Sequence, residues 1–275
     1  MVRLGEPQEA RWLLEEVSGL DEAALVRESE EEAPGEAVAR LESLVTRRLG
    51  GEPLQHVLGH WSFRTLEVAV DPRVLVPRPE TEVVVEVALS ELDRLTRLQP
   101  AREMLAVDLG TGSGVIALSL VVERAGVRVL ATDRDPAALE VAGGNLSRIA
   151  IEAARRVELR GGAWYAAVPG ELAGRLDLIV SNPPYLAAHE WADLDPVVRN
   201  FDPYEALVAG PDGLEAIAAI VSEAPAWLAG HGAVVVEIAP HQAAEALTVA
   251  HSAGFEVARV EDDLVGRARV LVASR

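Results

Sequence analysis

The chain contains neither cysteine nor lysine, so the 25 basic residues among its 275 are all arginines. Without cysteine it cannot form disulfides, use a thiolate nucleophile or bind zinc through thiolates, and this composition fits the reducing cytoplasm. Without lysine it has no phosphate-binding lysine of a P-loop or protein kinase, and no Schiff-base lysine. These two absences exclude many common enzyme classes.

Positive charge and long apolar runs are also scarce. The net charge is −19, whereas proteins that grip nucleic acid need cations to replace the counterions of the phosphates. Apolar runs such as residues 115–122 are far shorter than the roughly 18 residues of a membrane span, and the first residues lack the apolar segment of a signal peptide. We therefore expect a soluble, cytoplasmic protein without a membrane or stable nucleic-acid partner.

The first 60 residues differ in pattern from the rest of the chain. Their apolar residues recur three and four positions apart, which predicts a small N-terminal domain of two to four helices. The acidic stretch 28–36, with Pro34-Gly35 as a helix breaker, predicts a solvated loop between helices.

Residues 61–78 alternate apolar and polar side chains and predict a β-hairpin that links two domains. We expect its turn at Asp71-Pro72 and its return strand at Val74–Val76. A proline followed by acidic residues then predicts the start of a helix over residues 77–92, because acidic side chains suit the positive end of a helix.

Residues 79–275 are predicted to form an α/β domain. Strand and helix patterns alternate along it, which indicates a mostly parallel, seven-stranded sheet with helices on both faces and an antiparallel pair at one edge. The predicted strands are 104–108, 127–132, 156–160, 176–181, 233–238, 255–260 and 269–273, and the helices lie around 114–124, 136–149, 213–228 and 240–252.

A glycine-rich loop follows the first of these strands, in "AVDLGTGSGVIAL" at 106–118. Gly110, Gly112 and Gly114 allow positive φ and a close approach of the backbone to a ligand. Asp133 ends the next strand, where this architecture holds a ribose diol, although a helix-capping role shared with Asp135 is the alternative. The pattern predicts a nucleoside-bearing cofactor, and both S-adenosylmethionine and NAD satisfy it.

The quartet "NPPY", residues 182–185, ends the fourth strand of this domain. Two prolines cannot continue a sheet, so the chain leaves it there in a rigid turn. The side-chain oxygen of Asn182 and the carbonyl of Pro183, held by Pro184, can accept both hydrogens of a planar N–H₂ group, and Tyr185 can stack on it. The quartet therefore favours methylation of a planar nitrogen over hydride transfer.

Together, "LVPRPETE" at 75–82, "VDLGTGSG" and "VSNPPY" resemble the HemK/PrmC family, the glutamine N5-methyltransferases of peptide chain release factors. The resemblance extends through "GEPLQHVLGHWSF", "DPYEALVAGPDGL" and "VVVEIAPHQ" to the end of the chain. It implies a class I, Rossmann-like methyltransferase domain at 79–275, preceded by a helical substrate-recognition domain at 1–60 and the hairpin linker at 61–78. It also implies S-adenosyl-L-methionine as cofactor, S-adenosyl-L-homocysteine as product, and class 1 release factors as partners in translation termination.

The resemblance also implies roles for single residues. The cofactor would be held by the loop, the acidic strand end, an aromatic side chain and the quartet's amide: Asp108, Gly110, Thr111, Gly112, Gly114, Asp133, Trp164 and Asn182. Catalysis would rest on the quartet, Asn182, Pro183, Pro184 and Tyr185. The substrate glutamine would meet Asn182, Pro183 and Tyr185 and the lip residues Arg78, Pro79, Glu80 and Thr81. The chain departs from many relatives at Ala163, where they carry an acidic residue.

Two other functions are compatible with parts of the pattern. "NPPY" alone is shared with adenine-N6 methyltransferases of nucleic acid, against which the charge of −19 counts. A catalytically silent adaptor that binds cofactor or partner is the other alternative, which the nearly complete set of contact residues disfavours.

Overall fold

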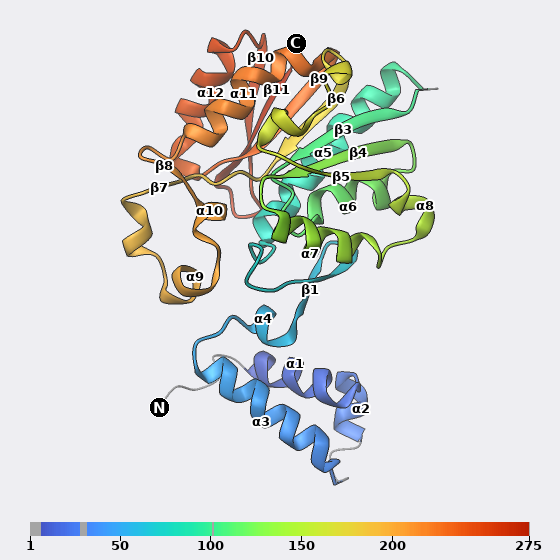
Figure 1. The fold of residues 1–275 in the computed structure, drawn as a ribbon, viewed down its shortest axis with the longest axis vertical. Helices are drawn as coiled ribbons and strands as arrows, with labels where there is room; N and C mark the ends of the chain where they lie inside the picture. Colours follow the sequence, from blue (N-terminus) through green and yellow to red (C-terminus); the bar gives the residue numbers. More distant parts are fainter. Residues whose placement is uncertain (1–6, 28–31, 101, 275) are drawn as a thin grey trace.

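The helical domain stands apart from the rest of the molecule. The computed structural model describes residues 7–27, 32–100 and 102–274 (Figure 1). In that part of the chain, four helices precede the hairpin, as predicted: α1 (Pro7–Ser18), α2 (Glu22–Arg27), α3 (Gly35–Leu49) and α4 (Leu54–Leu58). The apolar faces of α1, α3 and α4 meet in a small core of their own, formed by Leu13, Leu44, Leu54 and Val57. The predicted acidic loop lies partly outside the described residues.

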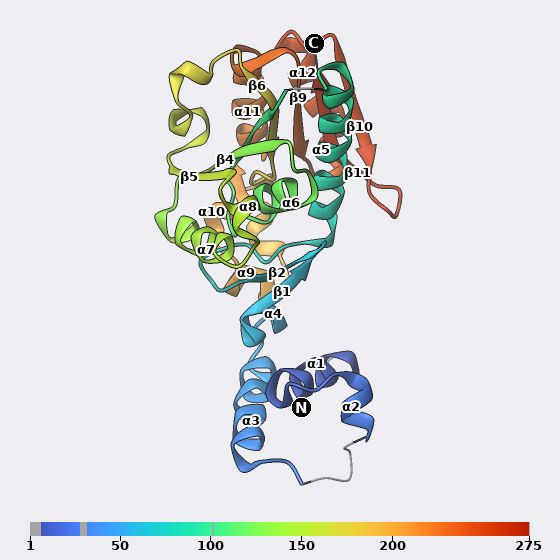
Figure 2. The ribbon, with the colours of Figure 1, turned by 90° about the vertical axis from the view of Figure 1, so that its right-hand side faces the viewer.

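A hairpin connects this domain to the α/β domain (Figure 2), but its turn was predicted wrongly. Strands β1 (His60–Phe63) and β2 (Leu66–Ala69) pair directly, so the turn falls at residues 64–65 and the expected return strand is not formed. Arg64, with a positive φ of 51°, is held there because its guanidinium bonds Glu123 at 2.7 and 2.8 Å. Val74 instead packs against helix α7 (Pro136–Leu146).

The α/β domain has the predicted seven strands in the order β10-β11-β9-β6-β3-β4-β5. Strands β3, β4, β5, β6 and β9 run parallel, while β11 pairs antiparallel with β9 and with the edge strand β10, as expected. The strand bounds are Met104–Leu109, Val127–Asp133, Val157–Gly161 and Leu176–Ser181 for β3 to β6, then Leu228–Glu237, Val257–Asp262 and Ala268–Ser274 for β9 to β11.

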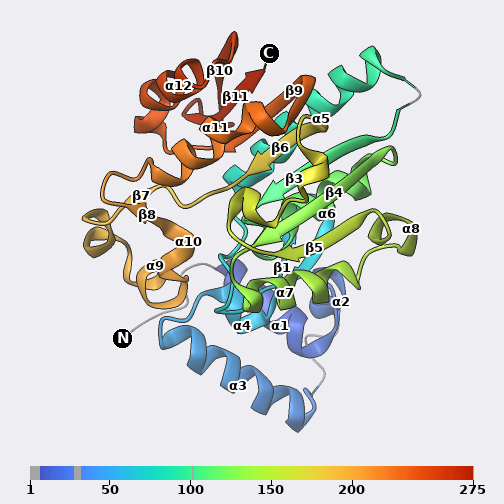
Figure 3. The same cartoon turned by 45° about the horizontal axis from the view of Figure 1, so that its top comes forward.

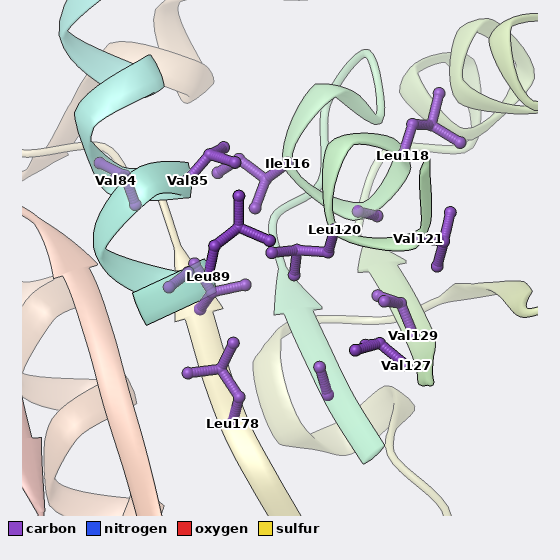
Figure 4. Close-up of a cluster of buried hydrophobic side chains, with 14 of the residues drawn as sticks. Val84, Val85, Leu89, Ile116, Leu118, Leu120, Val121, Val127, Val129 and Leu178 are labelled. Atoms are coloured by element: carbon purple, nitrogen blue, oxygen red, sulfur yellow. The ribbon is translucent and has the colours of Figure 1, made fainter. Parts of the chain in front are cut away.

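Helices cover both faces of this sheet, as the alternation predicted. Helices α5 (Pro79–Leu98), α6 (Val115–Glu123) and α8 (Ile151–Ala154) pack with one face, and α11 (Glu215–Trp227) and α12 (Ala243–Ser252) with the other. Figure 4 shows Leu89 of α5 and Leu120 of α6 extending toward one another, and both belong to one apolar core with strand residues such as Leu178. Both faces are covered, so a strand such as β6 is buried along its whole length, with an apolar centre at residues 178–180.

The order of the strands positions the functional loops. From β3 the chain proceeds to one side through β4 and β5, then returns to the other side with β6. Open α/β sheets bind ligands at the carboxyl ends of the strands where the order reverses in this way. Because β3 and β6 are paired neighbours, the glycine loop and the "NPPY" quartet that follow them lie side by side.

An insertion between β6 and α11 stands beside the same edge (Figure 3). It contains β7 (Leu186–Ala187), α9 (Pro196–Phe201), α10 (Tyr204–Leu207) and β8 (Val208–Gly210), and is closed on itself because β7 and β8 pair. The described helices include none with the length and apolar character needed to span a bilayer.

Candidate functional site

A cavity of about 780 Å³ opens at the carboxyl edge, between the glycine loop, the start of α5 and the insertion. It gathers nine of the residues implied from the sequence: Arg78, Thr81, Gly110, Thr111, Gly112, Asp133, Trp164, Asn182 and Pro184. The insertion supplies a wall that was not foreseen, through residues such as Pro203, Glu205 and Ala206. The volume is in the range of small-molecule and cofactor sites.

Asp108 does not line this cavity, in contrast to the role the resemblance implied. Its side chain is fully buried below the loop, where Oδ2 accepts hydrogen bonds from the Thr111 hydroxyl at 2.5 Å and the Ala117 backbone N–H at 3.2 Å. Burial raises the pKa of this carboxyl to about 7. Asp108 therefore holds the loop in shape from below.

Asp133 lies at the tip of β4 and faces the cavity. Its Oδ2 accepts from the Gly112 backbone N–H at 2.9 Å, and its Oδ1 from the Asp135 N–H at 3.0 Å. Asp135 caps helix α7 by accepting from the Ala137 N–H at 2.8 Å, so capping is the work of Asp135. Each oxygen of Asp133 keeps a lone pair that can accept from a hydroxyl group.

Trp164 and Gly110 form a close pair on the wall of the cavity. The three loop glycines have positive φ, as expected, and a Cβ on Gly110 would lie 3.3 Å from the Trp164 ring. Trp164 itself has a positive φ of 45°, a conformation that costs a non-glycine residue roughly 1–2 kcal/mol. The flat ring therefore lies against bare backbone and offers a surface for a planar ligand.

The amide of Asn182 is held on one side only. Its Nδ2 donates to the Thr81 hydroxyl at 3.0 Å, and Thr81 in turn donates to Oε2 of Glu237 at 2.7 Å. Among the hydrogen bonds of the described residues, none uses Asn182 Oδ1 or the carbonyl of Pro183. Two acceptors on adjacent residues thus have no hydrogen-bond partner among the described residues, and of these two residues Asn182 lines the cavity.

Tyr185, the last residue of the quartet, does not line the cavity. Its ring packs against the apolar core that the sheet shares with α11 and α12, and its hydroxyl is 3.5 Å from Oε1 of Glu237. Burial raises its pKa. Gln242 ties the end of the quartet to Gly213, because its Nε2 donates to the carbonyls of Tyr185 at 2.9 Å and Gly213 at 3.0 Å. Tyr185 and Gln242 support the turn from below.

Replacing Gly213 with alanine should disturb these hydrogen bonds of Gln242. Gly213 has a φ of +79°, and a Cβ there would lie 2.7 Å from the Tyr185 carbonyl oxygen, which forces the quartet to move. Displacing reacting groups by even part of an ångström is expensive, and we expect kcat to fall about 10-fold or more. Gly174→Ala is the control: its φ is +71°, but nothing lies within 4 Å. It should lose only about 1 kcal/mol of unfolding free energy and keep its kcat, and equal kcat values for the two variants would contradict this role of Gly213.

Of the other three lip residues, Arg78 lines the cavity, whereas Pro79 and Glu80 do not. Arg78 pairs with buried Asp202 at 2.5 Å. It also lines a smaller hollow of about 280 Å³ between the helical domain and α9. Pro79 begins α5, and Glu80 pairs with Arg267 at 3.2 Å.

Glu237 was not among the predicted site residues. It is 1% exposed and is linked to Asn182 through Thr81 and to Tyr185 directly. A carboxylate at the end of an apolar strand, in "VVVEIAPHQ", was a usable signal, because buried acids need a specific partner. Gly114 and Pro183 lie in the site's loops but do not line the cavity.

Known protein families match both parts of this chain. The family model "PrmC N-terminal domain" matches residues 5–59, and the model "Methyltransferase small domain" matches residues 91–201. The fold is thus that of a class I, Rossmann-like methyltransferase, here joined to a helical domain of the PrmC type.

Curated relatives narrow the class to one family. The release factor glutamine methyltransferase of Cereibacter sphaeroides is 40% identical over 97% of this chain and 90% of its own length. That of Deinococcus radiodurans is 38% identical over 100% and 94%. The chain belongs to the release factor glutamine methyltransferase family.

Solved structures of more distant methyltransferases share the fold. The N-terminal domain of human METTL16 in complex with SAH is 15% identical, with a TM-score of 0.54 over 75% of each chain. The Thermus thermophilus 16S rRNA N2 G1207 methyltransferase RsmC, in complex with AdoMet and guanosine, is 17% identical, with a TM-score of 0.52 over 78% of this chain and 49% of its own. At this level of identity the likeness concerns the fold alone.

Proposed function

We propose that this protein transfers a methyl group from S-adenosyl-L-methionine to the side-chain nitrogen, N5, of the glutamine in the Gly-Gly-Gln motif of class 1 peptide chain release factors. It would thereby modulate translation termination in the cytoplasm. The observation that carries the proposal is the pair of free acceptors, Asn182 Oδ1 and the Pro183 carbonyl, beside a cavity of cofactor size. The two relatives named release factor glutamine methyltransferase, at 38–40% identity, support the choice of substrate.

The residues around the cavity fit S-adenosylmethionine. Asp133 can accept from ribose hydroxyls, and the ring of Trp164 can lie against the adenine. The backbone of the glycine loop can approach the ligand closely at Gly110 and Gly112, which have no side chains. When bound, the cofactor supplies a methyl group on a positively charged sulfur. Ala163, where many relatives carry an acidic residue, also lines the cavity and offers the adenine only its backbone and a methyl group.

The quartet can orient a primary amide without removing its proton first. An amide nitrogen is a poor nucleophile because its lone pair is delocalised, so the enzyme gains most by holding the N–H₂ group in the line of attack. Asn182 Oδ1 and the Pro183 carbonyl can accept one N–H each, which stabilises the positive charge that develops on the nitrogen. The proton can leave after the methyl group has been transferred.

An adenine amine would satisfy the same two acceptors, and the quartet does not distinguish the two substrates. The net charge of −19 opposes a polyanionic ligand, and the curated relatives quoted are named for a protein substrate. No feature of the described residues favours nucleic acid over protein.

The test is mass spectrometry of a class 1 release factor after incubation with the enzyme and S-adenosylmethionine. We expect one added methyl group on the glutamine of the Gly-Gly-Gln motif, and none on a release factor with alanine at that position. DNA and RNA incubated with the same enzyme should gain no label. Methylated adenine together with an unmodified release factor would overturn the proposal.

A further inference from the structure

We propose that Glu237 is a positioning residue: its carboxylate, acting through the Thr81 hydroxyl, determines which end of the Asn182 amide faces the cavity. The proposal rests on the proposed function, because it explains how one acceptor for the substrate amide is oriented. Thr81 and Glu237 are 156 positions apart, and Asn182 is 101 positions from Thr81.

The argument follows from the direction of the hydrogen bonds. A carboxylate can only accept, so Thr81 must donate its single proton to Glu237 Oε2, at 2.7 Å. The Thr81 oxygen then has only lone pairs left for Asn182, and it must accept from Nδ2, at 3.0 Å. The carbonyl end of the amide consequently points the other way, where it is free to accept from a substrate.

The surroundings of Glu237 leave Thr81 no other acceptor for its proton. The side chain is 1% exposed, so water cannot supply an alternative partner for Thr81, which is itself 3% exposed. The charged and titratable groups that face Glu237 are Arg269 from β11, which favours the anion, Glu80 from α5, which opposes it, and Tyr185. Tyr185 contributes a long contact of 3.5 Å to Oε1.

Protonation of Glu237 would remove this constraint. A neutral carboxyl can either donate to Thr81 or accept from it, so Thr81 could donate to Asn182 and turn the amide round. Burial raises the pKa of Glu237 from 4.5 to about 7, against the opposing hydrogen bond from Thr81. The orientation of Asn182 should therefore be lost as the pH falls through neutrality, and kcat should fall with it.

The experiment measures kcat for the release factor and the Kd of S-adenosylmethionine between pH 5.5 and 9 for the wild type and three variants. Thr81→Val keeps the shape but has no hydroxyl, and should lower kcat at pH 8 by about 10-fold, the size of one neutral hydrogen bond. Thr81→Ser keeps the hydroxyl and should restore kcat to within about 2-fold of the wild type. These two variants and the third, Glu237→Gln, should bind the cofactor with wild-type affinity, since neither Thr81 nor Glu237 is needed to hold it.

Glu237→Gln separates positioning from a merely structural role. Glutamine matches the neutral carboxyl in shape and can either donate or accept, so this variant should have a lowered kcat that does not rise between pH 6 and 8, while that of the wild type does. The stability of the wild type should change with pH in the opposite direction to its kcat. Because the pKa of Glu237 is higher in the folded than in the unfolded protein, the wild type should lose unfolding free energy, relative to Glu237→Gln, as the pH rises from about 4.5 to about 7. Ionisation of the cofactor is common to both proteins and cancels in the comparison.

The outcomes are separable from failure of the proposed function. If the wild type does not methylate the release factor, the proposed function fails. If the wild type is active, a Thr81→Val kcat within 2-fold of the wild type, or identical pH profiles for the wild type and Glu237→Gln, would overturn the positioning role. Loss of cofactor binding in these variants would overturn it as well, because the residues would then belong to the cofactor site.

Discussion

Asn182→Ala is expected to lower kcat about 100-fold or more while leaving the Kd of S-adenosylmethionine nearly unchanged. The substitution removes the oxygen that accepts from the substrate amide, and the loss of one preorganised polarising group typically has an effect of this size. It also leaves Thr81 without its partner at 3.0 Å, so the whole chain of bonds from Glu237 to the substrate is broken. Single-turnover methylation of a release factor, with cofactor affinity from calorimetry, measures both quantities.

Gln99→Ala is the matched control for this experiment. Gln99 also carries an amide but follows the end of α5 that lies away from the cavity, where it accepts from Arg102 at 3.2 Å. Its kcat and cofactor affinity should equal those of the wild type. If Asn182→Ala instead lost cofactor binding and kept kcat at saturating cofactor, Asn182 would be a cofactor ligand and the role proposed for the quartet would be wrong.

Asp133→Ala is expected to have the opposite profile. Two charge-assisted hydrogen bonds to the ribose would be lost, and the backbone N–H of Gly112 would lose its acceptor at 2.9 Å. We expect the Kd of S-adenosylmethionine and of S-adenosylhomocysteine to rise about 100-fold or more, with a much smaller change in kcat once cofactor is saturating. Isothermal titration calorimetry measures the first effect, and methylation at high cofactor concentration the second.

Asp195→Ala controls for the loss of an acidic side chain at a strand or helix end. Asp195 caps α9 by accepting from the Val197 N–H at 2.8 Å, so its removal should lower stability by about 1 kcal/mol without changing cofactor affinity. Unchanged affinity in Asp133→Ala would mean that Asp133 serves only to shape the glycine loop.

The site buries acids beneath both of its loops. Asp108 lies below the glycine loop and Glu237 below the quartet, and burial raises the pKa of each to about 7. Each bonds a threonine hydroxyl, Thr111 and Thr81 respectively. A buried acid that accepts from a hydroxyl holds a loop from the side away from the ligand, and leaves the loop's other face free to bind.

Local patterns in the sequence determined most of the fold. The alternation of strand and helix and the seven strands follow from apolar periodicity, because that periodicity is set by the geometry of each element alone. The antiparallel edge pair follows from the short connection between the last two strands. The placement of the glycine loop, Asp133 and the quartet at one edge also follows, since parallel strands bring their carboxyl ends together. The hairpin was predicted less well, because its turn at Arg64 depends on Glu123, 59 positions away.

The tertiary structure alone decided how the site is supported. No local pattern relates Thr81 to Glu237 or Asn182, and their hydrogen bonds exist only because α5 packs across the ends of β6 and β9. Packing also placed Asp108 below the loop, Tyr185 behind the quartet and the insertion along the cavity wall. The sequence by itself thus determined which groups meet at the edge of the sheet, whereas their orientation required contacts between distant segments, whose geometry depends on the packing of the whole domain.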